Sequence, residues 1–367
     1  MIKPLVILFV AQAAVLGCSP AMGAEAGEFY ELLRARDQTP FGFLRLDMRP
    51  AYAGSLEKGE TAFEVEVGYQ NTWASSPNVE KYLTSLESQG RRALGAAELQ
   101  AIRDLPGENY LVDLESATLD IIVHYKFAEH WTGYLIASGV SYQGGFLDST
   151  IESFHDAFGF SSFGRPAVRK NQINYIYDLK GAQLASLDAP SDGGVLDPTL
   201  GVRYAGWGLP DRWALSLEAA VKVPVDGTRQ MLSTGHYDYG LQASLQRHGD
   251  RHAVYVDVAA VYYGGTDFPA RQDAQVIPTL IVGYEYRLTP TTNINLQAYA
   301  STSADSKRLT DLDELTGNKY QYSLGIRHRR GRALLTFGVT ENVQNLNNTP
   351  DIGFQLGIAY LPLRSQT

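Results

Sequence analysis

The chain has 367 residues, of which 19% are charged, and its formal net charge at pH 7 is −9. This composition excludes the basic footprint of a nucleic-acid-binding protein and the highly charged, apolar-poor composition of a disordered chain. No run of about 18 or more apolar residues follows the N-terminus, which excludes a helical membrane protein.

The N-terminus predicts an export signal. Lys3 precedes an apolar stretch, and small residues such as Ala21 and Gly23 follow it, as in secretory signal peptides. We expect a signal peptide over residues 1–23, with cleavage between residues 23 and 26. The chain's one cysteine, Cys18, lies inside this signal, in surroundings that loosely resemble a lipoprotein cleavage box. It is either discarded with the signal or a lipid attachment site. If it is discarded, the exported protein has no thiol.

Residues 24–60 form an irregular segment that contains one short strand-like run at residues 43–52. Counting this run as a membrane strand would give an odd number of strands and would place the N-terminus outside the cell. We therefore expect residues 24–60 to be either a periplasmic N-terminal segment or a plug inside a barrel that spans residues 61–363.

Twelve later runs alternate apolar residues with polar or small ones. Within residues 276–288, for example, Val276 and Leu280 share one face while Thr279 and Glu285 share the other. Strict period-two alternation predicts β-strands. Many of the runs reach the roughly 9–11 residues that a tilted strand needs to cross a bilayer. The predicted strands are residues 62–73, 113–127, 131–143, 195–207, 212–223, 236–248, 251–263, 275–288, 292–302, 320–330, 332–342 and 351–363.

Short turns alternate with long connections between these strands. The longest connections are residues 74–112, with short helices predicted at residues 79–88 and 96–105, and residues 144–194. This alternation with an even strand count is typical of outer-membrane barrels, whereas a soluble β-sandwich would have shorter strands. Closure is required because an open sheet edge in lipid leaves backbone groups unpaired. We predict an all-β fold, a single antiparallel transmembrane β-barrel of about 12 strands, with short helices in extracellular loops.

The last strand ends in a sequence similar to the signal that the barrel assembly machinery reads. Gln355, Gly357 and Tyr360 occupy its polar, glycine and aromatic positions, although a tail at residues 361–367 follows. The expected location is the bacterial outer membrane. The expected partners are the lipid bilayer, lipopolysaccharide, the barrel assembly machinery and a small solute, with no nucleic acid.

If the apolar face of the strands meets lipid, the opposite face lines the lumen, and it carries charges of both signs. Isolated buried ions would destabilise the fold, so these charges need water or partners. The lumen is then either a narrow wet pore or a closed interior held by salt bridges, with N-terminal residues as a plug. The predicted pore-lining residues are Glu64, Glu66, Asp120, His124, Lys126, Arg203, Glu218, Lys222, Asp238, Asp257, Glu285, Arg287 and Arg327, with Asp197 and Arg329 on the same face.

The loop at residues 144–165 carries the most distinctive polar cluster. Asp148, Glu152 and His155 follow a helical spacing that places them on one face. A carboxylate and an imidazole one turn apart can bind a metal or transfer a proton. We favour the structural interpretation, in which Asp148 caps the helix and the other two side chains hydrogen-bond locally. Together with Arg165, these are our candidate loop or gate residues.

An apolar stripe of Ile151, Phe154 and Phe158 adjoins that polar face. We expect this stripe to pack the loop onto the rim of the barrel. The expected gate role rests on the loop's place in the longest connection, because a segment at that end could cover the lumen.

Several short motifs resemble a known family. They are Arg36-Asp37-Gln38 with Pro40, Asp113 with Glu115, and a block from Gly145 to Arg165 that contains Asp148, Glu152 and His155. These motifs resemble DUF3187, an uncharacterised bacterial outer-membrane family of unknown function. The resemblance spans most of the chain beyond the signal. It implies an outer-membrane location and supplies no activity and no functional residue.

Three function classes stay open at this point. The first is a narrow pore or facilitator for small polar or charged solutes, and the second is a non-conducting barrel with a structural or surface-binding role. The third is an outer-membrane enzyme, but no His-x-Ser with a suitably placed Asn lies on an outward face, as barrel phospholipases require. We predict no enzymatic activity, no cofactor and no metal site.

Overall fold

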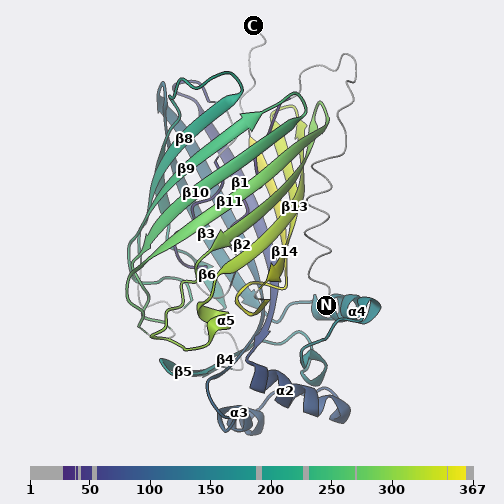
Figure 1. Ribbon diagram of the computed structural model, residues 1–367. Coiled ribbons are helices and arrows are strands. Elements are labelled where there is room, and N and C mark those ends of the chain that lie inside the picture. The colour runs from purple at the N-terminus through teal and green to yellow at the C-terminus, as the bar shows by residue number, and fades with distance from the viewer. Residues whose placement is uncertain are drawn as a thin grey trace.

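A computed structural model describes residues 28–37, 39, 43–51, 56–186, 192–225, 231–268, 271–344 and 346–360. Within these residues, twelve antiparallel strands close into one barrel, because each strand pairs with the next, β2 pairs with β3, and β15 pairs with β1 (Figure 1). The predicted fold class is therefore confirmed. The barrel strands are β1 (Thr61–Ser75), β2 (Asn109–Ala128), β3 (Trp131–Gln143), β7 (Thr199–Tyr204), β8 (Trp213–Lys222), β9 (Asp238–His248), β10 (His252–Tyr263), β11 (Gln275–Thr289), β12 (Thr292–Ser301), β13 (Lys319–Arg330), β14 (Ala333–Gln344) and β15 (Ile352–Tyr360).

Three predictions lie outside the described residues. They are the signal peptide at residues 1–23, the lipid-attachment role of Cys18 and the tail at residues 361–367. None of the described helices is long and apolar enough to cross a membrane.

One predicted strand, residues 195–207, is wrong in its bounds. The chain forms β6 (Gly193–Val195) and then β7, both paired with β3, and the register changes from Val195 opposite Gly139 to Thr199 opposite Ile136. The change means that one extra residue is accommodated between the two pieces. Pro198 lies in this break and has no N–H group to donate to a neighbouring strand. The strand also ends earlier, at Tyr204.

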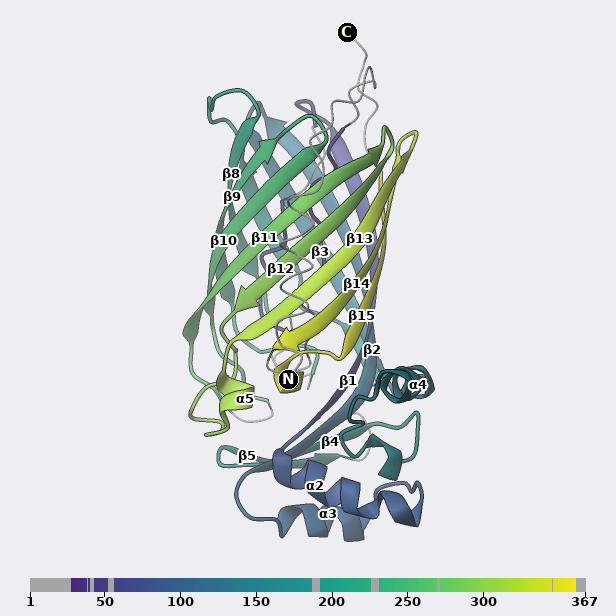
Figure 2. The same ribbon diagram turned by 45° about the vertical axis from the view of Figure 1, so that its right-hand side comes forward.

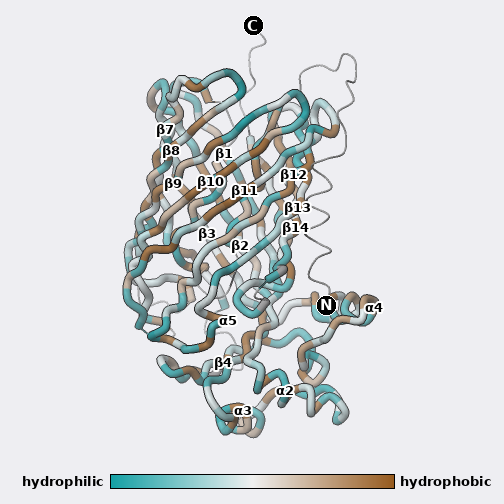
Figure 3. The backbone as a smooth tube through the Cα atoms, in the orientation of Figure 1, coloured by the Kyte–Doolittle hydropathy of each residue, from teal (hydrophilic) through white to brown (hydrophobic). Residues whose placement is uncertain are grey.

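The two faces of the strands are as predicted. On β1, Val65 and Val67 are exposed while Glu64 and Glu66 are buried, and hydrophobic and hydrophilic residues alternate along the barrel wall in Figure 3. The exposed face is apolar, as expected for a surface that contacts lipid. Exposed aromatic residues gather near both ends of the barrel, which is also typical of membrane barrels. They include Trp131, Trp207 and Trp213 near one end and Tyr237, Tyr239 and Tyr262 near the other.

The barrel has two different ends. The end with short connections, such as Glu129-His130 between β2 and β3, is called the turn end, and it lies at the top of Figure 1. The opposite end carries the long connections and is called the loop end. The helices in the long connections are α2 (Pro77–Leu86), α3 (Ala96–Arg103), α4 (Asp148–Phe158) and α5 (Asp313–Thr316), with short 3-10 turns at Glu87–Gln89, Arg165–Ala167 and Leu346–Asn348.

An extension projects beyond the barrel at the loop end (Figure 2). It forms because β1 and β2 continue past the barrel, β4 (Asn174–Leu179) pairs with the outer part of β2, and β5 (Ala182–Ser186) pairs with β4. The predicted helices at residues 79–88 and 96–105 correspond to α2 and α3. They bury one apolar cluster against this small sheet, with fully buried members Val79, Leu83, Ile102 and Leu111.

The described residues from 28 to 50 lie inside the barrel and are called the luminal segment. No strand forms at residues 43–52 in the part that the structure describes. The segment starts at the turn end, where Tyr30 contacts Glu285, and reaches the loop end, where Asp37 meets Lys319. It then returns, and Leu56 accepts a hydrogen bond from Lys126 near the turn end. The segment therefore enters and leaves the barrel at the same end.

Candidate functional site

The luminal segment brings arginines to the carboxylates of the barrel wall. Arg49 lies 2.8 Å from Asp120 and 3.3 Å from Glu66, measured between Nη and carboxylate oxygen atoms. Arg36 approaches Asp120 from the other side at 3.2 Å. These carboxylates lie on inward-facing positions of β1 and β2, because alternate residues of a strand face the same side. All of these side chains are nearly or fully buried. The ion pairs therefore take the place of the hydration that these charged groups would have in water.

A second ionic group lies deeper toward the turn end. Glu64 accepts a hydrogen bond from the Nε2 atom of His124 at 2.5 Å and is 3.3 Å from the Nε atom of Arg34. Arg34 also donates to the carbonyl oxygen of Pro50 on the returning part of the segment. One arginine therefore joins the wall to both arms of the luminal segment.

A third ionic group ties the two arms together near the loop end. Arg45 is 2.9 Å from Asp37, and Lys319 of β13 is 3.6 Å from the same carboxylate. Lys319 also donates to the hydroxyl of Thr39 at 2.7 Å. The fully buried Lys319 is thus held in part by groups of the luminal segment.

The backbone of the luminal segment is satisfied by side chains of the wall. Glu285 accepts hydrogen bonds from the N–H groups of Tyr30 at 2.7 Å and Glu31 at 3.0 Å. Arg327 donates to the carbonyl oxygens of Tyr30 and Leu32, the latter at 2.9 Å. A buried irregular backbone needs such partners because it forms no regular secondary structure of its own.

Strands β8 and β9 hold the returning arm in the same way. Lys222 donates to the carbonyl oxygen of Leu44 at 3.0 Å and pairs with Asp238 at 3.0 Å. Asp238 in turn accepts a hydrogen bond from the N–H of Leu46 at 2.7 Å. Lys222 therefore links the wall to the segment both directly and through a carboxylate.

The structure places the predicted pore-lining residues on the inward face. Eleven of the thirteen are buried, whereas Lys126 and Arg287 are half-buried near the turn end. Arg203 and Glu218 pair with each other on neighbouring strands at 2.5 Å. Arg287 lies over the ring of Phe29 at 5.0 Å. Their role in lining a conducting pore stays a prediction.

The sequence interpretation missed the partners of these residues. The four arginines of the luminal segment, Arg34, Arg36, Arg45 and Arg49, carry the contacts with the wall carboxylates or tie the two arms together. Their spacing was visible as four cations within 16 residues of an otherwise irregular segment. That signal could have indicated a cationic insert for an acidic lumen.

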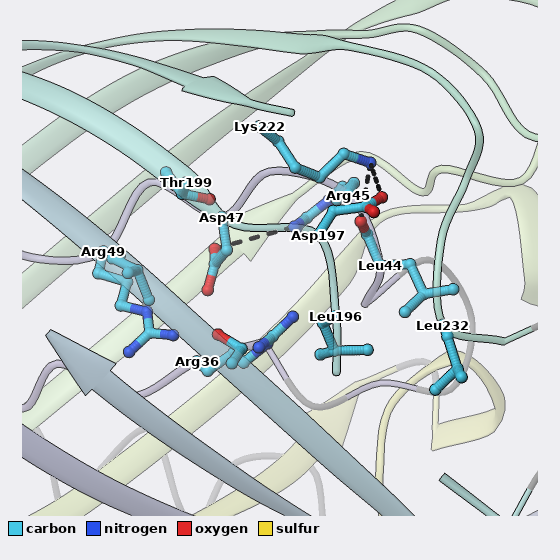
Figure 4. Close-up of a pocket in the computed structure, with 12 residues that line it drawn as sticks. Arg36, Leu44, Arg45, Asp47, Arg49, Leu196, Asp197, Thr199, Lys222 and Leu232 are labelled. Atoms are coloured by element: carbon cyan, nitrogen blue, oxygen red, sulfur yellow. Dashed lines mark hydrogen bonds and ion pairs between the residues drawn. The ribbon is translucent and has the colours of Figure 1, made fainter. Parts of the chain in front are cut away.

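The interior leaves little free volume between these groups. A cavity in the middle of the barrel, shown in Figure 4, has a volume of about 20 Å³. This is room for about one water molecule. Its polar lining comes from both the segment and the wall and includes Arg36, Arg45, Asp47, Arg49, Asp197 and Lys222. In the residues that the structure describes, the segment thus narrows this part of the lumen to the size of a water molecule.

The loop end is closed by apolar contacts. Phe43, at the tip of the luminal segment, joins a buried cluster with Tyr142, Tyr175 and Met231 from three different connections or strand ends. The Tyr142 hydroxyl donates to the Met231 carbonyl oxygen at 2.7 Å. The tip of the segment and the long loops therefore share one hydrophobic core.

The four candidate loop residues lie around α4, and Asp148, Glu152 and Arg165 form ion pairs there. The half-buried His155 instead has its ring near those of Phe160 and Phe163. Asp148 is the first residue of α4 and pairs with Arg165 at 2.9 Å. The capping position belongs to Leu147, so the predicted cap by Asp148 is wrong. Glu152 is held by two cations, Arg91 at 2.6 Å and Lys170 at 2.8 Å. The ion pairs join α4 to neighbouring loops, since all of these cations lie outside the helix.

These pairs change the titration of α4. Burial alone would raise the pKa of Glu152, but the hydrogen bonds from Arg91 and Lys170 outweigh it and lower that pKa. Burial lowers the pKa of His155. Among the described residues, no group of three or more His, Cys, Asp or Glu side chains is arranged to hold a metal ion.

The helix α4 lies beside the barrel wall at the loop end, outside the barrel, in both ribbon views (Figures 1 and 2). This position differs from the expected gate, because the helix does not lie across the mouth of the barrel. Of its apolar stripe, Ile151 is buried, and its expected packing on the rim stays a prediction. The packing prediction is wrong for Phe154 and Phe158, which are 52% and 65% exposed.

Comparisons with known proteins agree with the barrel fold. Residues 84–361 match the family described as protein of unknown function (DUF3187), and no curated protein matches the chain. The chain is similar to the COG4313 outer membrane channel from Pseudomonas putida F1, with a TM-score of 0.52 and 13% identity, over 86% of this chain and 99% of that one. It is less similar to the NanC porin, with a TM-score of 0.43 and 8% identity over 82% and 100% of the two chains. For the toluene transporter TbuX from Ralstonia pickettii, the TM-score is 0.39 and the identity is 10% over 83% and 90%.

Proposed function

The chain belongs to the DUF3187 family of proteins of unknown function, and from its geometry we propose that it is an outer-membrane channel for small charged or polar solutes. We further propose that the luminal segment closes this channel and that conduction requires the segment to move. The observation that carries the proposal is the contact between segment and wall, in which ion pairs and backbone hydrogen bonds stand beside small apolar clusters such as those that hold Leu32 and Leu46. This function requires no catalytic group.

The membrane location in this proposal rests on the outer face of the barrel. Its exposed side chains are apolar along the strands and aromatic near both ends. Exposing so much apolar surface to water would be unfavourable. A surface that faces a bilayer is expected to be apolar in this way. Long loops on one end and short turns on the other favour an orientation with the loop end outside the cell.

The proposed movement rests on the type of contact between segment and wall. An ion pair such as Arg49 with Asp120 loses its Coulomb attraction on separation, but both ions regain hydration, so the net cost is far below the gross attraction. Because both arms of the segment leave at the turn end, withdrawal needs no passage through the loop end. The apolar side chains of the segment, such as Leu32 and Leu46, are buried in clusters with wall residues and have no such compensation, so they favour the closed state.

The charge of the wall predicts the ion that passes. When the segment is in place, its arginines neutralise wall carboxylates. When it withdraws, the buried carboxylates of the barrel strands outnumber the buried cations between the extension and the turn end. The open lumen should therefore prefer cations. The cations of the turn end that are only half-buried lie where water screens them. The seven wall carboxylates are Glu64, Glu66, Asp120, Glu218, Asp238, Asp257 and Glu285, and the four buried cations are Arg203, Lys222, Lys319 and Arg327.

The test compares the intact protein with a variant that lacks residues 28–50 in planar lipid bilayers. We expect rare or small openings from the intact protein and a steady, several-fold larger conductance from the deletion variant. The reversal potential in a KCl gradient should indicate preference for K⁺. Heat-modifiable gel mobility shows whether each barrel is folded.

A folded deletion variant that stays silent would overturn the channel proposal. It would support the second candidate function, a non-conducting barrel with a structural or surface-binding role. The observation that favours this candidate is the packed interior, with a central cavity of about 20 Å³.

A further inference from the structure

The helix α4 buries two carboxylates together with Ile151 and leaves the aromatic rings of Phe154 and Phe158 exposed, beside exposed polar residues on its other side. Asp148 and Glu152 are buried by their pairs with Arg165, Arg91 and Lys170. A surface helix in water has the opposite arrangement, with the apolar stripe toward the core. The exposure of these two rings while carboxylates are buried indicates an apolar environment on the side of Phe154 and Phe158.

Four phenylalanines form the outer surface of this region. Phe146, Phe154, Phe158 and Phe160 are 65%, 52%, 65% and 46% exposed. The ring centroids of Phe154 and Phe158 are 4.7 Å apart, and those of Phe158 and Phe160 are 6.1 Å apart. The rings of Phe154, Phe158 and Phe160 thus make one contiguous patch, and exposed patches of this kind mark contact sites for apolar partners. This set of four residues is called the phenylalanine patch.

The phenylalanine patch continues the outer face of the barrel. The ring of Phe146 stacks on that of Tyr69 at 5.1 Å. Tyr69 lies on β1, two residues beyond Val67, on the same exposed face. Figure 2 shows α4 immediately beside the end of the barrel wall near β1 and β2. The apolar outer face of the strands is therefore followed, at the loop end, by Phe146 and then by the exposed rings of α4.

We propose that α4 is an interfacial anchor whose phenylalanine patch inserts among the acyl chains of the lipid leaflet that surrounds the loop end. Amphipathic helices with aromatic residues bind membranes in this way, with the helix parallel to the surface. This proposal rests on the membrane location in the proposed function. It adds a lipid-binding surface on a loop helix that the strands alone do not provide.

The anchor is joined to the barrel through a charged link. Arg165 pairs with Asp148 of α4 and also with Asp351, next to the start of β15, at 2.5 Å. It also donates to the side-chain oxygen of Asn71 on β1 at 3.2–3.3 Å. Since β15 and β1 are paired neighbours, α4 is tied to the seam where the first and last strands of the barrel meet.

The test uses spin labels on single cysteines, in a Cys18→Ser background of the full chain reconstituted into lipid vesicles. Labels are placed by Phe154→Cys and Phe158→Cys on the patch. The matched control is Asp156→Cys, an exposed position on the same helix that points away from the patch. Leu119→Cys, an exposed position of β2, serves as the lipid reference. Collision with oxygen, which concentrates in lipid, is compared with collision with a water-soluble nickel chelate.

We expect labels at positions 154 and 158 to collide mainly with oxygen, as the label at position 119 does, and the label at position 156 to collide mainly with nickel. Equal nickel accessibility at positions 154, 156 and 158 would overturn the anchor. Protection of positions 154 and 158 from both reagents would also overturn it, since a second protein surface would then cover the patch. If position 119 is also open to nickel, the barrel is not inserted, and the underlying membrane location fails instead.

Discussion

The barrel interior and the extension at the loop end are both packed, but buried ion pairs have a much larger share in the interior. In the extension, Leu83, Ile102 and Leu111 are completely buried in an apolar cluster. In the interior, ion pairs such as those of Arg49 with Glu66 and Asp120 stand beside small apolar clusters such as that of Leu46 and Met48. Opening an apolar cluster costs about 25 cal/mol for each Å² exposed to water, whereas separated ions regain hydration. The comparison indicates that the extension is suited to one fixed arrangement. In the lumen, water and mobile ions can replace the ionic contacts between segment and wall.

The largest effect is expected from reversing one charge in the interior. Arg49→Glu places a third carboxylate beside Glu66 and Asp120, so repulsion should drive the luminal segment out of the barrel. Removing one partner of a buried ion pair typically costs about 3–5 kcal/mol. We expect a loss of that size in the free energy of unfolding, measured with urea in lipid vesicles, together with a several-fold rise in conductance.

The control for this prediction is Arg212→Glu. Arg212 pairs with Asp250 at 2.9 Å in an exposed turn, so its reversal changes the net charge equally without touching the interior. If both variants conduct alike, the interior charge does not hold the channel closed.

The next effect concerns the extension alone. Leu83→Ala removes a fully buried side chain from the apolar cluster, and such truncations cost about 2–5 kcal/mol. We expect faster proteolysis of the connection between β1 and β2, at unchanged conductance. Thr84→Ala, at the neighbouring exposed position, should change neither quantity. A conductance change in Leu83→Ala would show that the two regions are coupled and would remove the contrast between them.

A smaller effect is expected from pH at the border between the regions. The lowered pKa of Glu152 means that its ion pairs stabilise α4 at pH values above the unfolded pKa of about 4.3. This contribution is lost as the pH falls through the lower pKa of the folded state. Hydrogen exchange in α4, corrected for the intrinsic rate, should therefore rise on acidification. In Glu152→Gln this rise of hydrogen exchange on acidification should be absent. If the rise persists in that variant, another titrating group causes it.

The smallest effect is expected at the surface of the loop end. Lys180 and Asp311 lie 2.5 Å apart, but both are exposed, and exposed pairs contribute about 0.2–1 kcal/mol. Lys180→Gln should leave the urea midpoint within error of the unsubstituted protein and conductance unchanged. A loss of stability of about 2–5 kcal/mol, the range expected for Leu83→Ala, would mean that surface ion pairs, and not the apolar cluster, hold the loop end together.

The sequence predicts the barrel well because its information is local. Alternation such as Val65 and Val67 outward against Glu64 and Glu66 inward is written directly in neighbouring residues. The break at Pro198 was missed because the apolar pattern continues on both sides of it, although proline itself cannot take part in the ladder.

The closure of the lumen could not be predicted in the same way. Arg34, Arg36 and Arg49 lie in an irregular segment without periodicity. Their carboxylate partners lie on β1 and β2, further along the chain. The exposed side of Phe154 was also beyond the local pattern. From the sequence alone, the same stripe fits packing on the rim and contact with lipid equally well. The ion pairs of Asp148 and Glu152 fix how the helix is turned, and they come from residues outside it.

The measurement that tests the central claim most directly is block of the deletion variant by its own missing segment. A synthetic peptide of residues 28–50 is added to the turn-end side of a bilayer that contains the barrel without these residues. The matched control peptide has the four arginines replaced by glutamine. We predict that the native peptide abolishes the K⁺ conductance reversibly and that the control peptide does not. A conductance that both peptides leave unchanged, or that both block equally, would contradict closure of the lumen by its charged luminal segment.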